Sequence, residues 1–271
     1  MNNPTDAPPS ENAMPDVQGY EDSRHVAITR VGIKSIRSPV SISDKSGTQH
    51  TVANFAFSVY LPEDRKGTHM SRFTQLLNDY RSRVLSAANF SEMYTDMLDR
   101  LNSNAGTITM QFPYFIEKHA PVTGLPGMMD YNVTLCATAT EDSAVETRIK
   151  LDIPVTTLCP CSKEISKYGA HSQRSVITID ALLADAKNFF WQDIITSAEA
   201  QASAQLYSQL KRADEKFVTE HAYENPRFVE DLIREVATEL NKNKGIHAYH
   251  LEVENFESIH NHSAFAVIEK S

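Results

Sequence analysis

The second half of this chain is built around the stretch Ile149-Lys150-Leu151-Asp152-Ile153-Pro154-Val155-Thr156-Thr157-Leu158-Cys159-Pro160-Cys161-Ser162-Lys163-Glu164-Ile165-Ser166-Lys167-Tyr168-Gly169-Ala170-His171. Its first part alternates apolar side chains (Ile149, Leu151, Ile153, Val155) with other residues, which indicates a half-buried strand. A second strand-like run follows at residues 175–179. The stretch therefore predicts two strands joined by a loop that carries two of the three cysteines and a histidine.

Cys159, Cys161 and His171 make this loop a candidate metal site. Thiolate sulfur and neutral imidazole both bind zinc-like ions, and a catalytic zinc site keeps about three protein ligands and one open position. The separation of Cys159 and His171, 171 − 159 = 12 residues, has no matching pair downstream and argues against a zinc finger. Two small buried thiols beside an ordinary loop histidine would explain the composition equally well. A third ligand would have to come from elsewhere in the chain.

Hydrophobic periodicity predicts the remaining elements. The first half predicts strands over residues 26–36 and 51–61, helices over 73–84 and 90–101, and strands over 107–116 and 131–139. After the loop and its strands, helices over 190–211 and 226–241 precede strands over 246–256 and 263–268. Both halves have the order β-β-α-α-β-β, so we expect an α+β fold in two modules, residues 23–143 and 144–271. Open sheet edges in such a fold favour assembly into an oligomer.

Composition narrows the class of protein. The chain has 271 residues, 41% of them hydrophobic, which is enough to bury a core. No apolar run approaches the ~20 residues of a membrane helix and no signal peptide is apparent, so we expect a cytoplasmic protein that does not enter membranes. Residues 1–22 are rich in Pro and polar residues and predict a disordered tail. A net charge of −9 argues against nucleic-acid binding but allows a small anionic ligand in a local basic pocket.

Lys66, His69 and Arg72 stand at the predicted start of the first helix. Backbone N–H groups and basic side chains at a helix N-terminus favour phosphate binding. The same residues would equally suit an ordinary helix start.

Carboxylates and histidines in the second half form two further clusters. Glu215 belongs to a charge-mixed segment, residues 211–220, that reads as a solvated connector, and Glu230 belongs to the exposed face of the next helix. Glu257, His260 and His262 join the last two strands, where they could transfer protons or simply form a polar hairpin.

Several of these segments together resemble the type IB GTP cyclohydrolase family. The resemblance rests on residues 154–166, 168–171 and 173–175, and extends to residues 66–73, 210–216, 228–231 and 257–262. It implies a tunnelling fold (T-fold) of two tandem β-β-α-α-β-β modules per subunit, and a homotetramer. The implied reaction converts GTP and water to 7,8-dihydroneopterin triphosphate and formate, the first step of tetrahydrofolate biosynthesis.

The resemblance also implies roles for individual residues. Its metal ligands would be Cys159, His171 and Glu215, with Cys161 as a possible further ligand; zinc suits this set, and manganese or iron is feasible with a carboxylate in it. The remaining roles would be guanine binding for Glu230 and proton transfer for Glu257 and His260, assisted by His262. We assign Lys66, His69 and Arg72 to the triphosphate on our own inference.

Two other functions fit the same residues. A fold relative that reduces a nitrile on a deazaguanine base would use a cysteine as nucleophile and a nicotinamide cofactor. A purine- or pterin-binding oligomer without catalysis would bind GTP and release no formate. The carboxylate and histidines of the last hairpin favour an enzyme, because a binding site alone does not require them.

Overall fold

The computed structural model describes residues 15–139 and 143–271. Its described strands join one large, mainly antiparallel sheet: β1 (Ile28–Asp44), β2 (Gly47–Leu61), β3 (Val84–Leu85), β4 (Gly106–His119), β5 (Pro126–Ala139), β6 (Glu146–Leu158), β7 (Ser172–Leu183), β8 (Ala204–Gln205), β9 (Ile246–Asn255) and β10 (Ala264–Lys270). Its described helices are α1 (Met70–Tyr80), α2 (Phe90–Leu101), α3 (Pro160–Ile165), α4 (Trp191–Glu199), α5 (Arg212–Glu224) and α6 (Val229–Lys242). The expected mixed α+β class is confirmed.

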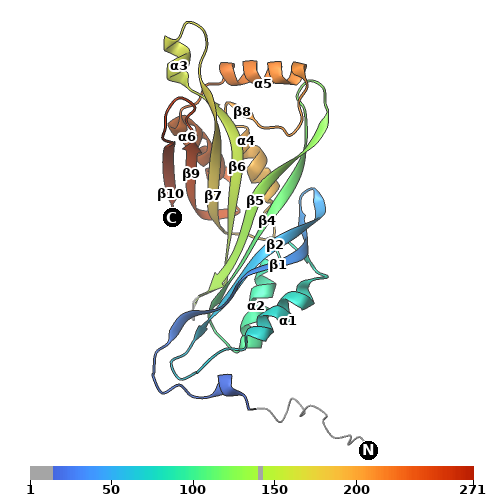
Figure 1. Cartoon of the computed structure of the whole chain (residues 1–271), viewed down its shortest axis with the longest axis vertical. Helices are drawn as coiled ribbons and strands as arrows, with labels where there is room; N and C mark the ends of the chain where they lie inside the picture. The colour runs from blue at the N-terminus through green and yellow to red at the C-terminus, as the bar shows by residue number, and fades with distance from the viewer. Residues whose placement is uncertain (1–14, 140–142) are drawn as a thin grey trace, which may run out of the picture.

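The strands of the two halves form one continuous sheet. Its order is β10-β9-β7-β6-β5-β4-β2-β1-β3, and β8 pairs with β6 beside this path. The halves meet where β5 pairs antiparallel with β6, so the sheet continues across residue 143. In Figure 1, α1 and α2 accompany the strands of the first half, whereas α4 and α6 accompany those of the second. The division into residues 23–143 and 144–271 stays a prediction.

Alternating burial explains why the helices lie against this sheet. In β6, Ile149, Leu151, Ile153 and Val155 are fully buried, while the residues between them are less buried. The apolar stripe of α6, which includes Leu232, Val236 and Leu240, is buried as well. These side chains join one hydrophobic cluster with the core of the first half, so burial of apolar surface stabilises both halves together.

The predicted helix over residues 190–211 is wrong beyond its first half. Helix α4 ends at Glu199, and the chain turns so that β8 pairs with Val155 and Thr156 of β6. Ser203 is fully buried in this turn, and its hydroxyl accepts a hydrogen bond from the backbone N–H of Leu158 at 3.0 Å. Pairing with a distant strand therefore outweighs the helical periodicity of this segment.

The prediction of a solvated connector over residues 211–220 is also wrong, because these residues form most of helix α5. The carboxylate of Asp214 accepts a hydrogen bond from the backbone N–H of Lys211 at 2.9 Å and so caps the start of this helix. Few side chains of α5 are buried, which explains why periodicity did not predict it.

The predicted tail over residues 1–22 is partly wrong. Residues 1–14 lie outside the described residues, but Val17–Gly19 form a 3₁₀ turn. The backbone of Gln18 and Tyr20 accepts hydrogen bonds from Gly67 and Lys66 at 3.1 and 3.0 Å. Backbone pairing fixes this polar segment without much apolar burial. None of the helices in the described part of the chain is long and apolar enough to cross a membrane.

Candidate active site

Cys159 begins the short helix α3 that opens the loop between β6 and β7. It is the N-cap residue, and its sulfur accepts a hydrogen bond from the backbone N–H of Ser162 at 3.4 Å. Pro160 at the first helical position favours this start. The thiol of Cys159 is half-buried, whereas Cys161 is exposed. The local sequence therefore orients Cys159 and leaves Cys161 facing solvent.

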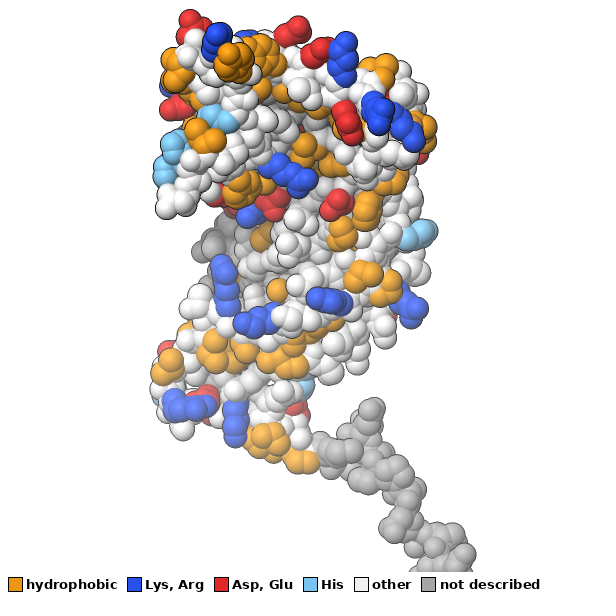
Figure 2. Space-filling model, turned by 45° about the horizontal axis from the view of Figure 1, so that its top comes forward, with side chains coloured by type: hydrophobic (Ala, Val, Ile, Leu, Met, Phe, Trp, Pro, Cys, Tyr) orange, Lys and Arg blue, Asp and Glu red, His pale blue; other side chains and the backbone are white. Residues whose placement is uncertain are grey.

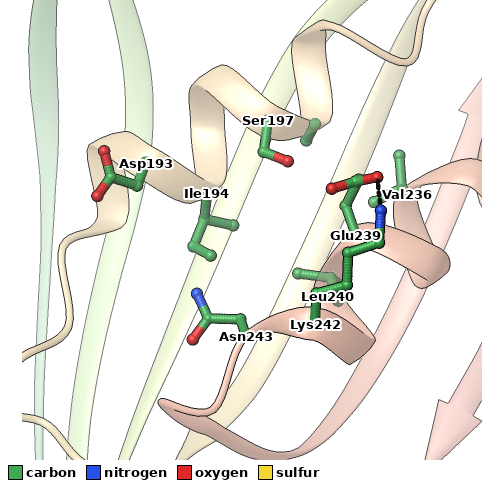
Figure 3. A pocket seen from close by; sticks show the side chains of 9 residues that line it. Asp193, Ile194, Ser197, Val236, Glu239, Leu240, Lys242 and Asn243 are labelled. Carbon is green, nitrogen blue, oxygen red and sulfur yellow. Dashed lines mark hydrogen bonds and ion pairs between the residues drawn. The ribbon is translucent and has the colours of Figure 1, made fainter.

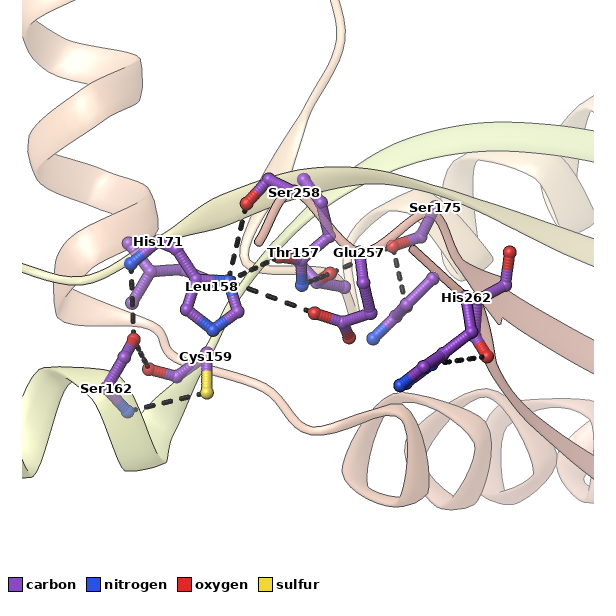
Figure 4. Close-up of polar contacts among 12 residues, drawn as sticks. Thr157, Leu158, Cys159, Ser162, His171, Ser175, Glu257, Ser258 and His262 are labelled. Atoms are coloured by element: carbon purple, nitrogen blue, oxygen red, sulfur yellow. Dashed lines mark hydrogen bonds and ion pairs between the residues drawn. The ribbon is translucent and has the colours of Figure 1, made fainter. Parts of the chain in front are cut away.

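His171 lies beside Cys159 although twelve residues separate them, because the loop closes on itself. The backbone N–H of Cys159 donates to the carbonyl of His171 at 3.1 Å. The backbone N–H of His171 in turn donates to the hydroxyl of Ser162 at 3.2 Å. Figure 4 shows Cys159, Ser162 and His171 grouped in this way. The loop therefore brings Cys159 and His171 together, and their metal-binding role stays a prediction.

Glu257, from the hairpin between β9 and β10, approaches the same histidine. Its Oε2 atom lies 3.9 Å from His171 Nδ1, and the two side chains are only 12% and 14% exposed. Ser258 Oγ lies 3.5 Å from the same nitrogen. His260 and His262 stack on each other with ring centroids 5.0 Å apart, and both are exposed. The sheet order therefore brings the last hairpin to the cysteine–histidine loop.

Glu215 and Glu230 are exposed side chains near the starts of α5 and α6. The end of α5 is fixed to α3, because Lys163 Nζ donates to the carbonyl of Tyr223 at 2.5 Å. Glu215 precedes Tyr223 by eight residues (223 − 215), which corresponds to about 12 Å along a helix axis. Among the residues that the structure describes, no three His, Cys, Asp or Glu side chains meet as a metal-binding group.

The start of α5 is nevertheless firmly placed. Asp214 is fully buried and accepts hydrogen bonds from the backbone N–H groups of Val122 and Thr123, both at 2.9 Å, and from the Thr123 hydroxyl at 2.7 Å. Burial alone would raise the pKa of Asp214. The hydrogen bonds from the N–H groups of Lys211 and Thr123 outweigh this effect, so the pKa lies well below its usual range. The tip of the β4–β5 hairpin thereby fixes the helix turn that carries Glu215.

Lys66, His69 and Arg72 lie far from the cysteine–histidine loop within one chain. Figure 1 shows α3 at the upper end of the long axis and α1 in the lower half of the molecule. His69 Nε2 lies 3.4 Å from Asp16 Oδ2, and Arg72 Nη1 donates to the carbonyl of Arg100 at 2.7 Å. The single chain does not bring these three residues to the other predicted site residues.

The loop offers two side chains, His171 and Cys159, that are suitable ligands for a divalent metal. His171 Nδ1 lies 2.9 Å from Gln173 Oε1, and within the described part of the chain the polar contacts of this ring are all made by Nδ1. Such an arrangement leaves Nε2 for a ligand, which is how metal-binding histidines are usually oriented. The sulfur of Cys159 is a second suitable donor. Cys159 and His171 could therefore hold a metal, and further ligands must come from another residue or another copy of the chain.

Buried polar residues behind His171 were missed by sequence reasoning. Gln173 and Ser175 occupy inward positions of β7, in phase with Ile177 and Ile179, and are 7% and 0% exposed. Thr157 occupies an inward position of β6 and is fully buried. Polar residues at apolar positions of an alternating strand were the available signal.

One surface pocket lies apart from this site. A pocket between α4 and α6 is lined by Asp193, Ser197, Glu239 and Lys242 among others, and the last two form an ion pair at 2.6 Å (Figure 3). It contains none of the predicted site residues. Figure 2 shows histidine side chains gathered near one edge of the upper end, while basic and acidic side chains are mixed over the rest of that face.

Comparison with solved structures supports the fold alone. The chain resembles a uricase from Arthrobacter globiformis with a TM-score of 0.53 at 7% identity, covering 89% of this chain and 92% of that chain. A thermostable variant of the same kind of enzyme gives a TM-score of 0.50 at 7% identity.

Comparison with known sequences is more specific. The family model described as type I GTP cyclohydrolase folE2 matches residues 14–266. The protein named GTP cyclohydrolase FolE2 in Azoarcus sp. is 54% identical over 263 residues, which are 97% of each chain. The protein of the same name in Thiobacillus denitrificans is 53% identical over 258 residues, 94% of each chain. The chain therefore belongs to the type I GTP cyclohydrolase FolE2 family.

Proposed function

We propose that this chain is a GTP cyclohydrolase that converts GTP and water to 7,8-dihydroneopterin triphosphate and formate, as the first step of tetrahydrofolate biosynthesis in the cytoplasm. The observation that carries the proposal is the family match over residues 14–266. Relatives named GTP cyclohydrolase FolE2 are 54% and 53% identical to this chain over nearly its whole length. The grouping of Cys159, His171 and Glu257 at one end of the sheet supplies chemistry that suits it.

Cys159 and His171 would hold a divalent metal, with Glu215 as the third protein ligand. A metal bound there would supply water that is nucleophilic at neutral pH, as ring opening at C8 of the purine requires. Zinc suits the cysteine and histidine, while manganese or iron suits a set that includes a carboxylate. Cys161 is a weaker candidate, because its side chain is exposed.

Glu257 and His260 would move protons during ring opening, sugar rearrangement and ring closure. The Glu257 carboxylate is nearly buried and lies within 3.9 Å of His171, so a proton that it holds would be close to the bond that is hydrolysed. His260 is exposed and stacks on His262, which leaves its ring accessible to a substrate. Glu230 would accept two hydrogen bonds from the N–H edge of guanine.

A complete site would be assembled from more than one copy of the chain. The uricase-like sheet supports a tunnelling fold. Two tandem modules of the type IB kind and a homotetramer are what the family resemblance implies for it. Figure 1 shows β10 at one edge of the sheet, and Phe265 and Val267 on it are 69% and 42% exposed. Lys66, His69 and Arg72 would then reach the triphosphate from a neighbouring subunit.

The test is an assay of the metal-supplemented protein with GTP that follows formate and the pterin chromophore. Cys159→Ala and His171→Ala are expected to abolish formate release while the protein remains folded. Cys136→Ala is the matched control, because Cys136 lies on β5 away from the loop and should retain activity. Full activity in either purified loop variant would refute the metal assignment. Oxidation of NADPH in place of formate release would favour the nitrile reductase, and GTP binding without formate would favour a binding protein.

A further inference from the structure

A chain of buried polar side chains runs from His171 into the sheet. His171 Nδ1 lies 2.9 Å from Gln173 Oε1, and Gln173 Nε2 donates to Thr157 Oγ1 at 2.8 Å. Thr157 Oγ1 lies 2.9 Å from Ser175 Oγ, which donates to Asn255 Oδ1 at 2.7 Å. This row of hydrogen-bonded side chains therefore links the candidate ligand on the loop to β6, β7 and β9 (Figure 4).

The four side chains behind His171 are shielded from water. Gln173, Thr157, Ser175 and Asn255 are 7%, 0%, 0% and 3% exposed. Buried polar groups of this kind need protein partners, because an unmade hydrogen bond costs about 1–3 kcal/mol. Water is therefore not at hand to replace a broken link, and each side chain depends on its neighbour.

With Ser175 donating to Asn255 Oδ1, counting protons gives the direction of each remaining hydrogen bond. Ser175 has one hydroxyl proton and donates it to Asn255, so it must accept from Thr157. Thr157 has then used its only hydroxyl proton, so it must accept from the amide nitrogen of Gln173. The amide oxygen of Gln173 is thereby turned toward His171. An oxygen that only accepts requires a proton on His171 Nδ1.

Two further neighbours of the ring act in the same direction. The Glu257 carboxylate, 3.9 Å from Nδ1, attracts a proton on that nitrogen. Ser258 Oγ, 3.5 Å away, has a lone pair that can accept from it. In the described part of the chain, no polar contact of the ring requires a proton on Nε2. The neutral ring is therefore held as the tautomer whose Nε2 lone pair is free.

We propose that Asn255, Ser175, Thr157 and Gln173 form a positioning relay that fixes the tautomer and ring orientation of His171, so that Nε2 is presented as a ligand. The proposal rests on the assignment of His171 to the metal site. None of the four residues touches the reacting atoms, and each acts through its neighbour. The relay also connects the loop to β9, the strand that leads into Glu257. One set of hydrogen bonds would thereby align a ligand and a proton-transfer group.

The first test uses the unchanged protein without metal or GTP. Long-range 1H–15N correlation spectra distinguish a histidine protonated at Nδ1 from one protonated at Nε2, and comparison with His171→Ala assigns the signal. The expected result is protonation at Nδ1 in the neutral ring. A neutral ring protonated at Nε2 overturns the relay outright, whatever the protein proves to bind.

The second test breaks one link without changing shape. Thr157→Val removes the hydroxyl group and keeps the branched side chain, whereas Thr157→Ser keeps the hydroxyl and serves as the rescue. Loss of the outer support of a ligand typically lowers metal affinity about 10- to 100-fold. That loss is expected for Thr157→Val, together with a mixture of tautomers in the metal-free protein. Thr157→Ser should restore both readouts to near the starting values.

A matched control separates the relay from general strand damage. Thr178 on β7 donates to Asp152 at 3.1 Å, outside the relay, so Thr178→Val should leave the tautomer and the metal affinity unchanged. Unchanged tautomer and affinity in folded Thr157→Val would overturn the proposal. A tautomer shift without any metal binding in the starting protein would retain the relay and refute the metal assignment instead. If Thr157→Val does not fold, Ser175→Ala with the same two readouts decides in its place.

Discussion

Replacing Glu199 by glutamine removes the charge that balances Lys118 inside the protein. Glu199, the last residue of α4, is 4% exposed, and Lys118 on β4 is 9% exposed. Lys118 Nζ lies 3.0 Å from both carboxylate oxygens, and the hydroxyl of Tyr131 donates to one of them at 2.8 Å. Burial lowers the pKa of Lys118, while the charge of Glu199 raises it. The carboxylate thus keeps a buried ammonium group charged.

The expected cost follows from this burial. Breaking a buried ion pair by removing one partner typically costs about 3–5 kcal/mol, because the remaining charge is left without compensation. The amide of Glu199→Gln can still accept one hydrogen bond, so we expect about 3 kcal/mol. Lys118 then has a pKa lowered further, so the folded state gives up its proton before the unfolded state does. The cost should therefore shrink as the pH rises toward the ordinary lysine pKa of about 10.5.

Urea unfolding at a fixed protein concentration measures this cost, with fluorescence and circular dichroism as independent probes. Asp193→Asn is the matched control, because its ion pair with Lys45 at 2.7 Å is 49% and 59% exposed on its two sides. An exposed pair is worth roughly 0–1 kcal/mol. The double change Lys118→Met with Glu199→Gln removes both charges and should be less destabilising than Glu199→Gln alone.

The reasoning fails if Glu199→Gln costs no more than Asp193→Asn at neutral pH. It also fails if the double change is as harmful as the sum of the two single changes, because the charges would then not be coupled.

Three further outcomes can be checked in the same protein. Burial raises the pKa of Asp44, which caps α4 through the backbone N–H of Gln192 at 2.9 Å, to about 6. Its ionisation therefore lowers the stability of the folded protein as the pH rises from about 4 to about 6. In urea titrations, Asp44→Asn should have the same free energy of unfolding as the natural protein below this range and one about 1–2 kcal/mol higher above it. An equal gain at all pH values would contradict this cause. Gly32→Ala should destabilise the protein by about 1–3 kcal/mol, since a Cβ there would overlap with the Phe57 carbonyl. Gly124→Ala measures the cost of backbone strain alone, because φ is +69° there and no atom lies within 4 Å of the added carbon. Equal costs for the two variants would refute the steric explanation. Asp214→Ala should lower metal content and activity together, because it releases the helix start that carries Glu215 from the β4–β5 hairpin, and retained metal binding would separate Glu215 from the site.

Much of the fold could be predicted from local pattern. The alternation of β6 and the apolar stripe of α6 are properties of successive residues, so the sequence predicted both elements within a few positions. The helix over residues 190–211 failed because Ala204 and Gln205 pair with a strand about fifty residues earlier, and no local period encodes that partner. Helix α5 was missed because it buries few side chains and has a weak apolar stripe.

The candidate site divides in the same way. The spacing of Cys159 and His171 within one loop, with Pro160 to start a helical turn, is written in the sequence, and closure of that loop brings the two residues together. Local pattern could not place them beside Glu257, because that neighbourhood depends on β7 pairing with β9, although the family resemblance had assigned Glu257 to the same site. The buried relay behind His171 likewise spans three strands. Sequence by itself determined which chemical groups are present and which elements carry them, whereas the sheet order, set by long-range backbone pairing and shared burial, decided which of those groups meet.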